Sequence, residues 1–244
     1  MVIHAAMVKA VIVKNAIVMV NAMAKKNAAV VATRTLINQQ DEYQEKLLNV
    51  NYNEKLLEMI KFAEENDVPI MQNEGIAFLI MLLKVKKPLR ILEIGSAIGF
   101  SSSMMALNSE AKIDTIERDS KMIAECKKNH LELNLLERIN LIEGDALDTL
   151  EIVKDNKYDL IFIDAAKAQY IKFFEMYSPL LNDNGVILSD NLYFHDLLFT
   201  EVNNRDLRQL VRKVGKYNEF LLNHPEFETH IFKIGDGIGV STRK

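Results

Sequence analysis

Few features of the sequence indicate a secreted or membrane-bound protein. It has a single cysteine, Cys126, so an internal disulfide framework is excluded and a reducing compartment such as the cytoplasm is expected. The apolar runs are short, and in residues 1–33 lysine or asparagine breaks them before the ~18 residues of a membrane span. Because 49% of the 244 residues are hydrophobic, we expect one substantial folded core and no membrane partner.

The first 33 residues contain no acidic residue, glycine, proline or aromatic residue. Lysines interrupt their apolar runs, which fits a secretory signal poorly, and an organellar presequence would contain arginine and serine. We therefore interpret residues 1–33 as an extension outside the main domain. Residues 34–88 are interpreted as an N-terminal helical cap, and residues 89–244 as the principal α/β domain.

The charge is distributed unevenly along the chain. The whole protein carries a formal net charge of −4, although residues 1–33 contribute four lysines and no acid. The remainder is therefore more acidic than the total suggests, which excludes a generic polyanion-binding protein. Any contact with a nucleic acid has to be local.

Helix-like and strand-like segments alternate after residue 34. Two segments with helical spacing of apolar residues, 38–66 and 72–86, precede the first strand-like run. The strand-like runs are apolar on both faces, as is typical of parallel strands covered by helices. We predict a doubly wound, mostly parallel α/β sheet with N-terminal helices and a closing antiparallel pair. The predicted strands are 89–94, 112–117, 139–144, 158–164, 185–190, 227–234 and 237–243, and the helices between them are 100–108, 120–134, 146–154, 167–181 and 203–222.

Glycines and acidic residues stand at the ends of the first three predicted strands. The turn after the first strand contains Gly95 and Gly99, which allow tight turning and close approach of the backbone to a ligand. Glu117 ends the second strand, where a carboxylate can accept both ribose hydroxyls of an adenosine cofactor. Asp145 follows the third strand, in a position to meet the adenine ring.

Glu93, which precedes this turn, and the spacing of the glycines favour S-adenosylmethionine over NAD as the adenosine cofactor. Glu93 would repel a pyrophosphate but could attract the ammonium group of a methionine moiety. The spacing Gly-x-x-x-Gly also differs from the Gly-x-Gly-x-x-Gly of dinucleotide binders. S-adenosylmethionine therefore fits better than NAD, and an ordinary turn with a solvent-facing glutamate is the alternative for this motif taken alone.

Hard oxygen ligands follow the fourth and fifth predicted strands. Asp164 ends the run IFID, and Asp190 and Asn191 end the run GVILSD. If these strands are neighbours, two carboxylates and an amide carbonyl meet at the edge where α/β folds build their sites, and they suit Mg²⁺ or another hard divalent cation. A cation there would lower the pKa of a bound substrate hydroxyl, so we also assign Asp164 a catalytic role.

Lys167, three residues after Asp164, is the candidate general base. An ordinary lysine is protonated at neutral pH, but a neighbouring dication and partial burial both depress its pKa. A protonated lysine would instead stabilise the oxygen anion electrostatically. A solvated lysine at a helix start remains the structural alternative.

The ordered set EIGSAIGFSS, TIERD, GDAL, FIDAAK, SDN and GDGIGVS resembles the cation-dependent class I O-methyltransferases, the family of catechol and caffeoyl-CoA O-methyltransferases. The resemblance covers roughly 68–244 and implies a Rossmann-like methyltransferase fold, a homodimer and Lys167 as the base. It implies Mg²⁺ at Asp164, Asp190 and Asn191. For S-adenosylmethionine it implies Met71, Glu93, Gly95, Ser96, Ser101, Glu117, Asp145 and Ala146.

Within that family the chain looks most like bacterial tRNA 5-hydroxyuridine methyltransferases, which form 5-methoxyuridine at the wobble position. In 5-hydroxyuridine the nucleobase offers a hydroxyl beside a carbonyl, which is comparable to a catechol. Relatives commonly have an acidic residue where this chain has Ala166, which affects the substrate side and leaves the acceptor open. A small catechol-like or phenolic acceptor is the alternative, and an NAD-dependent oxidoreductase or a non-catalytic adenosine-binding module is a more distant one.

Candidate acceptor residues lie in the second half of the chain. In the predicted helix 203–222, Arg205, Arg208 and Arg212 are spaced by three and four residues, so they share one face and could contact RNA. A splayed base would also need aromatic or polar neighbours, for which Tyr170 and His195 are candidates. Solvated helix faces and a loop histidine are the ordinary interpretations of the same residues.

Overall fold

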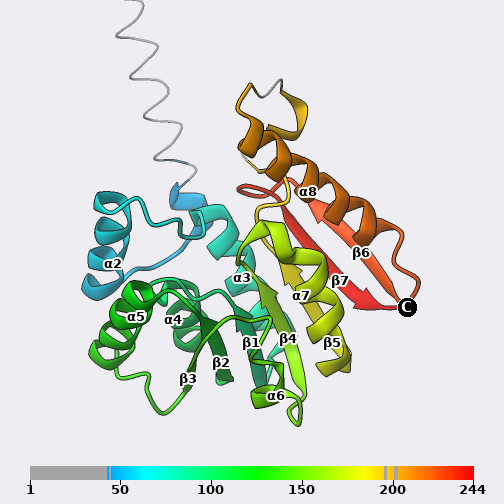
Figure 1. Ribbon diagram of the computed structural model, residues 1–244. Coiled ribbons are helices and arrows are strands. Elements are labelled where there is room, and N and C mark those ends of the chain that lie inside the picture. Colours follow the sequence, from blue (N-terminus) through cyan, green and yellow to red (C-terminus); the bar gives the residue numbers. More distant parts are fainter. Residues whose placement is uncertain (1–42, 44, 195–196, 201–202) are drawn as a thin grey trace, which may run out of the picture. The chain divides into compact units, whose positions relative to one another are not determined.

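The computed structural model describes residues 43, 45–194, 197–200 and 203–244 (Figure 1). The chain forms two compact units, Met1–Asn49 and Val50–Lys244, and the second unit contains the whole α/β body. The predicted extension 1–33 lies outside the described residues. So does His195, one of the candidate acceptor residues.

A seven-stranded sheet with the order β3-β2-β1-β4-β5-β7-β6 forms the centre of this unit. Strands β1 to β5 are parallel, and β7 pairs antiparallel with both β5 and β6. The predicted mixed sheet and its closing antiparallel pair are thus confirmed. The strands are β1 (Arg90–Ile94), β2 (Lys112–Glu117), β3 (Ile139–Glu143), β4 (Tyr158–Ile163), β5 (Leu181–Ser189), β6 (Phe227–Phe232) and β7 (Ile238–Arg243).

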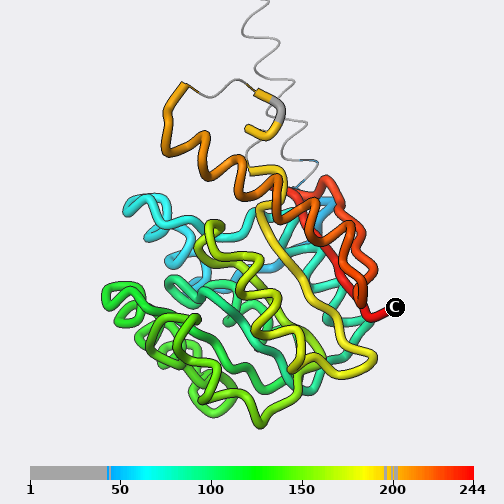
Figure 2. The backbone as a smooth tube through the Cα atoms, turned by 45° about the vertical axis from the view of Figure 1, so that its right-hand side comes forward, coloured from blue at the N-terminus to red at the C-terminus, as the bar shows by residue number. Residues whose placement is uncertain are grey.

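Helices cover both faces of the sheet (Figure 1). Side chains alternate along the strands: in β4, Leu160 and Phe162 join one hydrophobic cluster, and Ile161 and Ile163 join the other. The first cluster includes residues of α2, α3 and α4, and the second includes residues of α7 and α8. Figure 2 shows α8 crossing beside α7. The helices are α2 (Glu54–Glu65), α3 (Asn73–Lys86), α4 (Phe100–Leu107), α5 (Ser120–Glu132), α6 (Leu150–Val153), α7 (Tyr170–Tyr177) and α8 (Arg205–Leu222).

Three predicted helices differ from the observed ones. The segment predicted to be helical over 38–66 is interrupted in its described part: residues 45–48 are helical, residues 49–53 are not, and α2 begins after Asn53, whose side chain accepts the N–H of Leu56 and caps the helix. The segment 146–154 is helical only in α6. The segment 167–181 contains a short 3₁₀ turn, η1 (Lys167–Gln169), then α7 and a second 3₁₀ turn, η2 (Ser178–Leu180).

A polar cluster around the buried Asp114 joins four strands near their amino ends. Asp114 of β2 accepts hydrogen bonds from the Tyr158 hydroxyl at 2.8 Å, the Asn140 amide at 2.8 Å and the Arg90 guanidinium at 3.2 Å. These partners belong to β4, β3 and β1, so the cluster fixes the edge of the sheet that lies opposite the carboxyl ends of the parallel strands.

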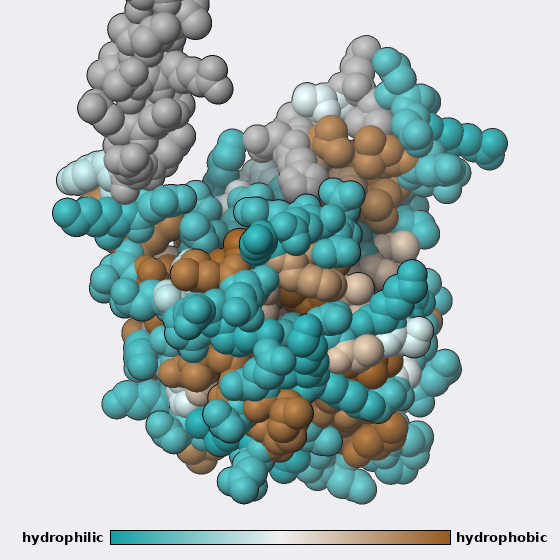
Figure 3. All heavy atoms as spheres, turned by 90° about the vertical axis from the view of Figure 1, so that its left-hand side faces the viewer, coloured by the Kyte–Doolittle hydropathy of each residue, from teal (hydrophilic) through white to brown (hydrophobic). Residues whose placement is uncertain are grey.

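The described surface is mixed in character. Figure 3 shows hydrophilic side chains over much of one face, with hydrophobic side chains in smaller areas between them. Among the helices in the described part of the chain, none is both long enough and apolar enough to cross a membrane.

Candidate active site

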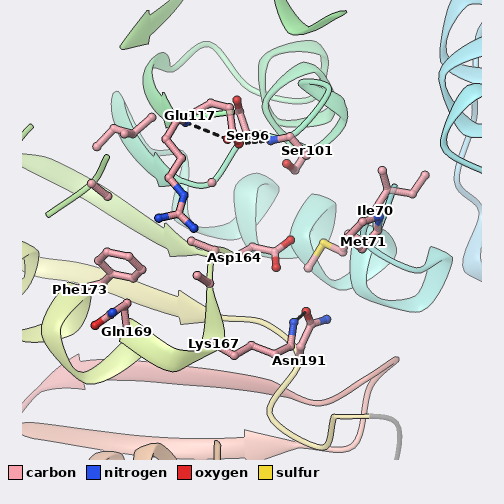
Figure 4. A pocket seen from close by; sticks show the side chains of 18 of the residues that line it. Ile70, Met71, Ser96, Ser101, Glu117, Asp164, Lys167, Gln169, Phe173 and Asn191 are labelled. Atoms are coloured by element: carbon pink, nitrogen blue, oxygen red, sulfur yellow. Dashed lines mark hydrogen bonds between the residues drawn. The ribbon is translucent and has the colours of Figure 1, made fainter. Parts of the chain in front are cut away.

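A cavity of about 370 Å³ opens at the carboxyl ends of the parallel strands (Figure 4). Its walls come from the ends of β1 to β4 and from the segment 69–72, which precedes α3. Predicted cofactor residues from five separate chain segments meet here. They are Met71, Gly95, Ser96, Ser101, Glu117, Asp145, Ala146 and Asp164.

The turn after β1 is held in an unusual backbone conformation. Gly95 and Gly99 have φ angles of 94° and 81°, and Ala97 between them has φ 45°. L-residues avoid this region, so surrounding contacts must stabilise Ala97. One such contact is the Glu117 carboxylate, which accepts the Ala97 N–H at 2.9 Å. Glu117 therefore shapes the turn as well as facing the cavity.

Glu93 does not line the cavity, contrary to the expected direct contact with a methionine ammonium group. Its buried carboxylate accepts the hydroxyls of Ser101 and Thr115, each at 2.5 Å. Burial raises the pKa of Glu93 to about 7, although these hydrogen bonds act in the opposite direction. Because Ser101 lines the cavity, Glu93 is connected to the ligand space through the Ser101 hydroxyl.

Asp145 is paired with Arg118, an arginine that was not among the predicted site residues. Asp145 accepts the Leu147 N–H at 2.9 Å and the Arg118 guanidinium at 2.8 Å, and both interactions lower the pKa of its carboxyl. Arg118 follows Glu117 directly and also lines the cavity. Because Arg118 directly follows Glu117 at the end of β2, the sequence could have indicated a second polar group at this site. The cavity wall also contains Ile70, Gln72, Gln169 and Phe173, which were not predicted.

Gly99, like Glu93, lies outside the cavity wall, and it packs against α5. An added Cβ there would lie 2.6 Å from Nε2 of His130. The His130 imidazole is 1% exposed, and burial lowers its pKa to about 4. Gly99 thus serves the shape of the turn and has no direct place in the ligand site.

His130 is expected to make the protein less stable in mild acid. The folded imidazole has a pKa of about 4 against an ordinary value of 6.5, so between these pH values the unfolded chain binds the proton more readily. The contribution of His130 to the free energy of unfolding should therefore fall as the pH drops from 6.5 towards 4, by up to about 3 kcal/mol, whereas the raised pKa values of Glu93 and Asp190 act in the opposite direction. Urea unfolding at several pH values, compared with His130→Gln, measures the effect. An identical pH slope in the variant would contradict it.

The oxygen ligands predicted for a cation come from neighbouring strands. Strands β4 and β5 pair directly, with Ile163 opposite Ser189, so Asp164 and Asp190 follow them side by side. Asp190 is 3% exposed, and burial together with the charge of Asp164 raises its pKa to about 8. Asp164 is partly buried, and its pKa is also raised by burial. Two carboxyls that disfavour being charged together are stabilised by a cation between them, so this donor set fits a hard divalent ion.

Asn191 completes the predicted ligand set and contacts Lys167. Its backbone has φ 62°, and its Oδ1 accepts a hydrogen bond from Lys167 Nζ at 2.5 Å (Figure 4). Lys167 belongs to η1, and both residues line the cavity. Within the described residues, no group of three or more His, Cys, Asp or Glu side chains could hold a metal, so the ligand set depends on the Asn191 amide.

The candidate acceptor residues lie in different environments. Tyr170 is 1% exposed, packs edge-on against Tyr217 and donates its hydroxyl to the Asp190 carbonyl oxygen at 3.2 Å. Tyr170 was expected to reach an acceptor, but its ring belongs to the core. Arg205, Arg208 and Arg212 are exposed on α8, as the helical spacing predicted, and α8 packs against η1.

The seven-stranded mixed sheet, with its glycine turn and strand-end acids around one cavity, is the Rossmann-like methyltransferase fold. The family model for O-methyltransferases matches residues 44–244. The chain belongs to this O-methyltransferase family.

Proteins of known structure and characterised relatives resemble the chain over most of its length. A Staphylococcus aureus structure, provisionally described as a caffeoyl-CoA O-methyltransferase, is 36% identical with a TM-score of 0.76 and covers 88% of this chain and 100% of its own. The S-adenosylhomocysteine-bound methyltransferase PaMTH1 of Podospora anserina is 26% identical with a TM-score of 0.76, covering 86% and 96%. The flavonoid 3′,5′-methyltransferase of Vitis vinifera is 28% identical over 200 residues, 78% of this chain and 84% of the relative.

Proposed function

We propose that the protein is an S-adenosylmethionine-dependent O-methyltransferase assisted by a divalent cation. One observation carries the proposal: the cavity formed by the glycine turn, Glu117 and Asp145 continues without interruption to Asp164, Lys167 and Asn191. Residues suited to an adenosine ligand and residues suited to a cation therefore share one space. Membership of the O-methyltransferase family and the S-adenosylhomocysteine bound by PaMTH1 support the choice of cofactor.

Each group of residues has a role in this reaction. Glu117 would accept the ribose hydroxyls, and the end of β3 at Asp145 would border the adenine. S-adenosylmethionine would supply the methyl group, and a cation held by Asp164, Asp190 and Asn191 would make a neighbouring acceptor hydroxyl more acidic. Lys167 Nζ, which donates to Asn191 Oδ1, would take the hydroxyl proton or stabilise the oxygen anion. Holding donor and acceptor in one cavity supplies the proximity that methyl transfer needs.

For the acceptor we propose 5-hydroxyuridine in tRNA. The motif resemblance supports it, as does the exposed basic face of α8, which packs against the η1 turn that carries Lys167. A small phenolic acceptor is the second candidate. It is supported by the flavonoid methyltransferase relative and by the caffeoyl-CoA O-methyltransferase description of the Staphylococcus aureus structure. A homodimer and a cytoplasmic location remain predictions.

A methyl-transfer assay tests the proposal. The protein, with S-adenosylmethionine and Mg²⁺, is incubated separately with tRNA that contains 5-hydroxyuridine and with a catechol, and the products are identified by mass spectrometry. We expect 5-methoxyuridine to form, to disappear in excess EDTA and to return when Mg²⁺ is restored, because two carboxylates need a hard cation. Full activity in EDTA would rule out the cation, and methylation of the catechol alone would favour the second acceptor.

Reversing the charge of Arg208 and Arg212 together is expected to raise the KM for tRNA at least about tenfold, because phosphate contacts dominate RNA affinity. The salt dependence of KM should weaken in parallel, whereas KM for S-adenosylmethionine should not change. Lys84→Glu combined with Lys87→Glu is the matched control. It makes the same charge change at exposed positions at the C-terminal end of α3, near the amino end of β1. Equal effects of the two double variants would exclude α8 as the local contact.

A further inference from the structure

One face of helix α5 contacts the back of the Gly95–Gly99 turn. Cys126, Asn129 and His130, which we call the α5 contact face, are 0%, 3% and 1% exposed. None of them lines the cavity. They form the layer directly behind the turn whose other side faces the ligand space.

Polar contacts join this face to the turn at several points. The Asn129 amide donates to the Ile98 carbonyl oxygen at 2.9 Å. His130 Nε2 lies 3.0 Å from the Ser102 hydroxyl, and that hydroxyl donates to the Gly99 carbonyl oxygen at 3.2 Å. These atoms are buried, so the loss of one partner would leave a polar group without solvent to replace it.

The contact is also steric. A Cβ on Gly99 would lie 2.6 Å from His130 Nε2 and 2.8 Å from Cys126 Sγ. Glycine is therefore required both by the φ angle of 81° and by the closeness of α5. The position of Gly99, and with it the first turn of α4, is set by where the imidazole lies.

The contact face connects directly to residues of the cavity wall. Ser96 lines the cavity, and its hydroxyl lies 3.6 Å from Cys126 Sγ. The Gly99 N–H donates to the Ser96 carbonyl oxygen at 2.7 Å. A shift of Gly99 away from α5 would thus move Ser96 and the adjoining backbone. Cofactor sites lose affinity when their supporting residues are displaced by as little as an ångström.

We propose that the α5 contact face positions the turn, and that His130 is a positioning residue for S-adenosylmethionine binding. This inference rests on the proposed function, because it takes the cavity to be the S-adenosylmethionine site. His130 acts through Gly99 and Ser102 and does not touch the cofactor. Its removal should weaken cofactor affinity more than it changes the rate of the bound complex, raising KM for S-adenosylmethionine with a smaller effect on kcat.

A double-mutant cycle tests the proposal, with isothermal titration of S-adenosylhomocysteine as the readout. We expect His130→Ala and Gly99→Ala each to raise the Kd about tenfold. The double variant should bind more tightly than the product of the two single effects predicts, because removal of the imidazole relieves the closer of the two clashes of the added Cβ and leaves only the one with Cys126 Sγ. Effects that simply multiply, or a His130→Ala variant with unchanged Kd, would overturn the proposal.

Two further variants separate positioning from general stability. His130→Gln keeps an N–H donor near the place of Nε2 and should restore Kd to within about threefold of the unaltered protein. Tyr158→Phe removes a buried hydrogen bond to Asp114 at the opposite edge of the sheet, so it should lower the melting temperature and leave Kd unchanged. If Tyr158→Phe weakens binding as much as His130→Ala, the effect is one of stability and the proposal is wrong.

A failure of the proposed function would give a different experimental result from a failure of this inference alone. If the unaltered protein shows no binding of S-adenosylhomocysteine, the proposed function and this inference both fall. If the unaltered protein binds and only the variants behave unexpectedly, the inference alone falls. Should His130→Ala not fold, Asn129→Ala removes the Ile98 contact and is expected to raise Kd about fivefold, and an unchanged Kd would then overturn the proposal.

Discussion

Replacing Asp190 by asparagine is expected to lower kcat on the order of a thousandfold while the Kd for S-adenosylhomocysteine stays within about threefold. Asp190 is buried at the end of β5, beside Asp164, and does not line the cavity that would hold the adenosine part. The amide keeps the shape of the side chain but removes the negative charge that a hard cation requires. Single-turnover methyl transfer and calorimetric titration measure the two quantities separately.

The same substitution should stabilise the protein when no divalent cation is available. Burial and the neighbouring Asp164 disfavour the charged form of Asp190, so without a cation the folded state must bind a proton there or carry an unfavourable charge, and the neutral amide removes this cost. We expect a higher melting temperature in EDTA for Asp190→Asn, and a smaller gain in melting temperature on adding Mg²⁺. Asp183→Asn, at an exposed position in the amino half of the same strand, is the matched control and should change neither quantity. Full turnover in Asp190→Asn would exclude the proposed cation site.

The placement of the candidate site could be predicted because parallel strands share one carboxyl edge. Glu117, Asp145 and Asp164 each follow an apolar run of strand length, so their convergence needed only the sheet and its order. The same reasoning placed Asp190 beside Asp164 once β4 and β5 were taken as neighbours. Residues whose position is set by strand ends are the ones that sequence patterns locate best.

Side-chain partners from distant elements could not be predicted in this way. Glu93 was expected to face the ligand, but its carboxylate is held by Ser101 from α4 and Thr115 from β2. Alternation along β1 defines two faces of the strand, and tertiary packing decides what each face meets. Tyr170 shows the same limit, because its ring joined the core where an acceptor contact was expected.

Local signals were available for one of the incorrect predictions. The prediction of continuous helical structure over 38–66 did not take two asparagines into account. Asn53 is a residue type that favours the N-cap position, and Asn49 adopts φ 52°. Asparagine is one of the few L-residues that tolerate this conformation. The periodicity of apolar residues alone predicts a helix that continues through both positions. The N-cap preference of Asn53 instead predicts a helix that begins at Glu54, as α2 does.

Replacing Gly95 by alanine is expected to abolish measurable binding of S-adenosylhomocysteine and to lower the melting temperature by about 4 to 12 degrees, on the order of a loss of 2 to 3 kcal/mol. The added Cβ would lie 2.3 Å from the backbone oxygen of Asp164 and 3.0 Å from Cα of Ala165. Backbone atoms cannot rotate away as a side chain can, so the ends of β1 and β4 would have to separate. The φ angle of 94° adds strain for any residue with a Cβ.

Gly215→Ala on α8 provides the matched control for this substitution. Among the residues that the structure describes, the added Cβ would meet only Leu198 Cδ2 at 3.7 Å, an ordinary van der Waals contact. Alanine is favoured over glycine in a helix by about 1 kcal/mol, so this variant should be slightly more stable and should bind S-adenosylhomocysteine normally. The two variants make the same chemical change, and their opposite outcomes would show that the close approach of β1 to β4 shapes the site. Normal binding by Gly95→Ala would instead mean that the strand ends can part without loss of the cofactor site.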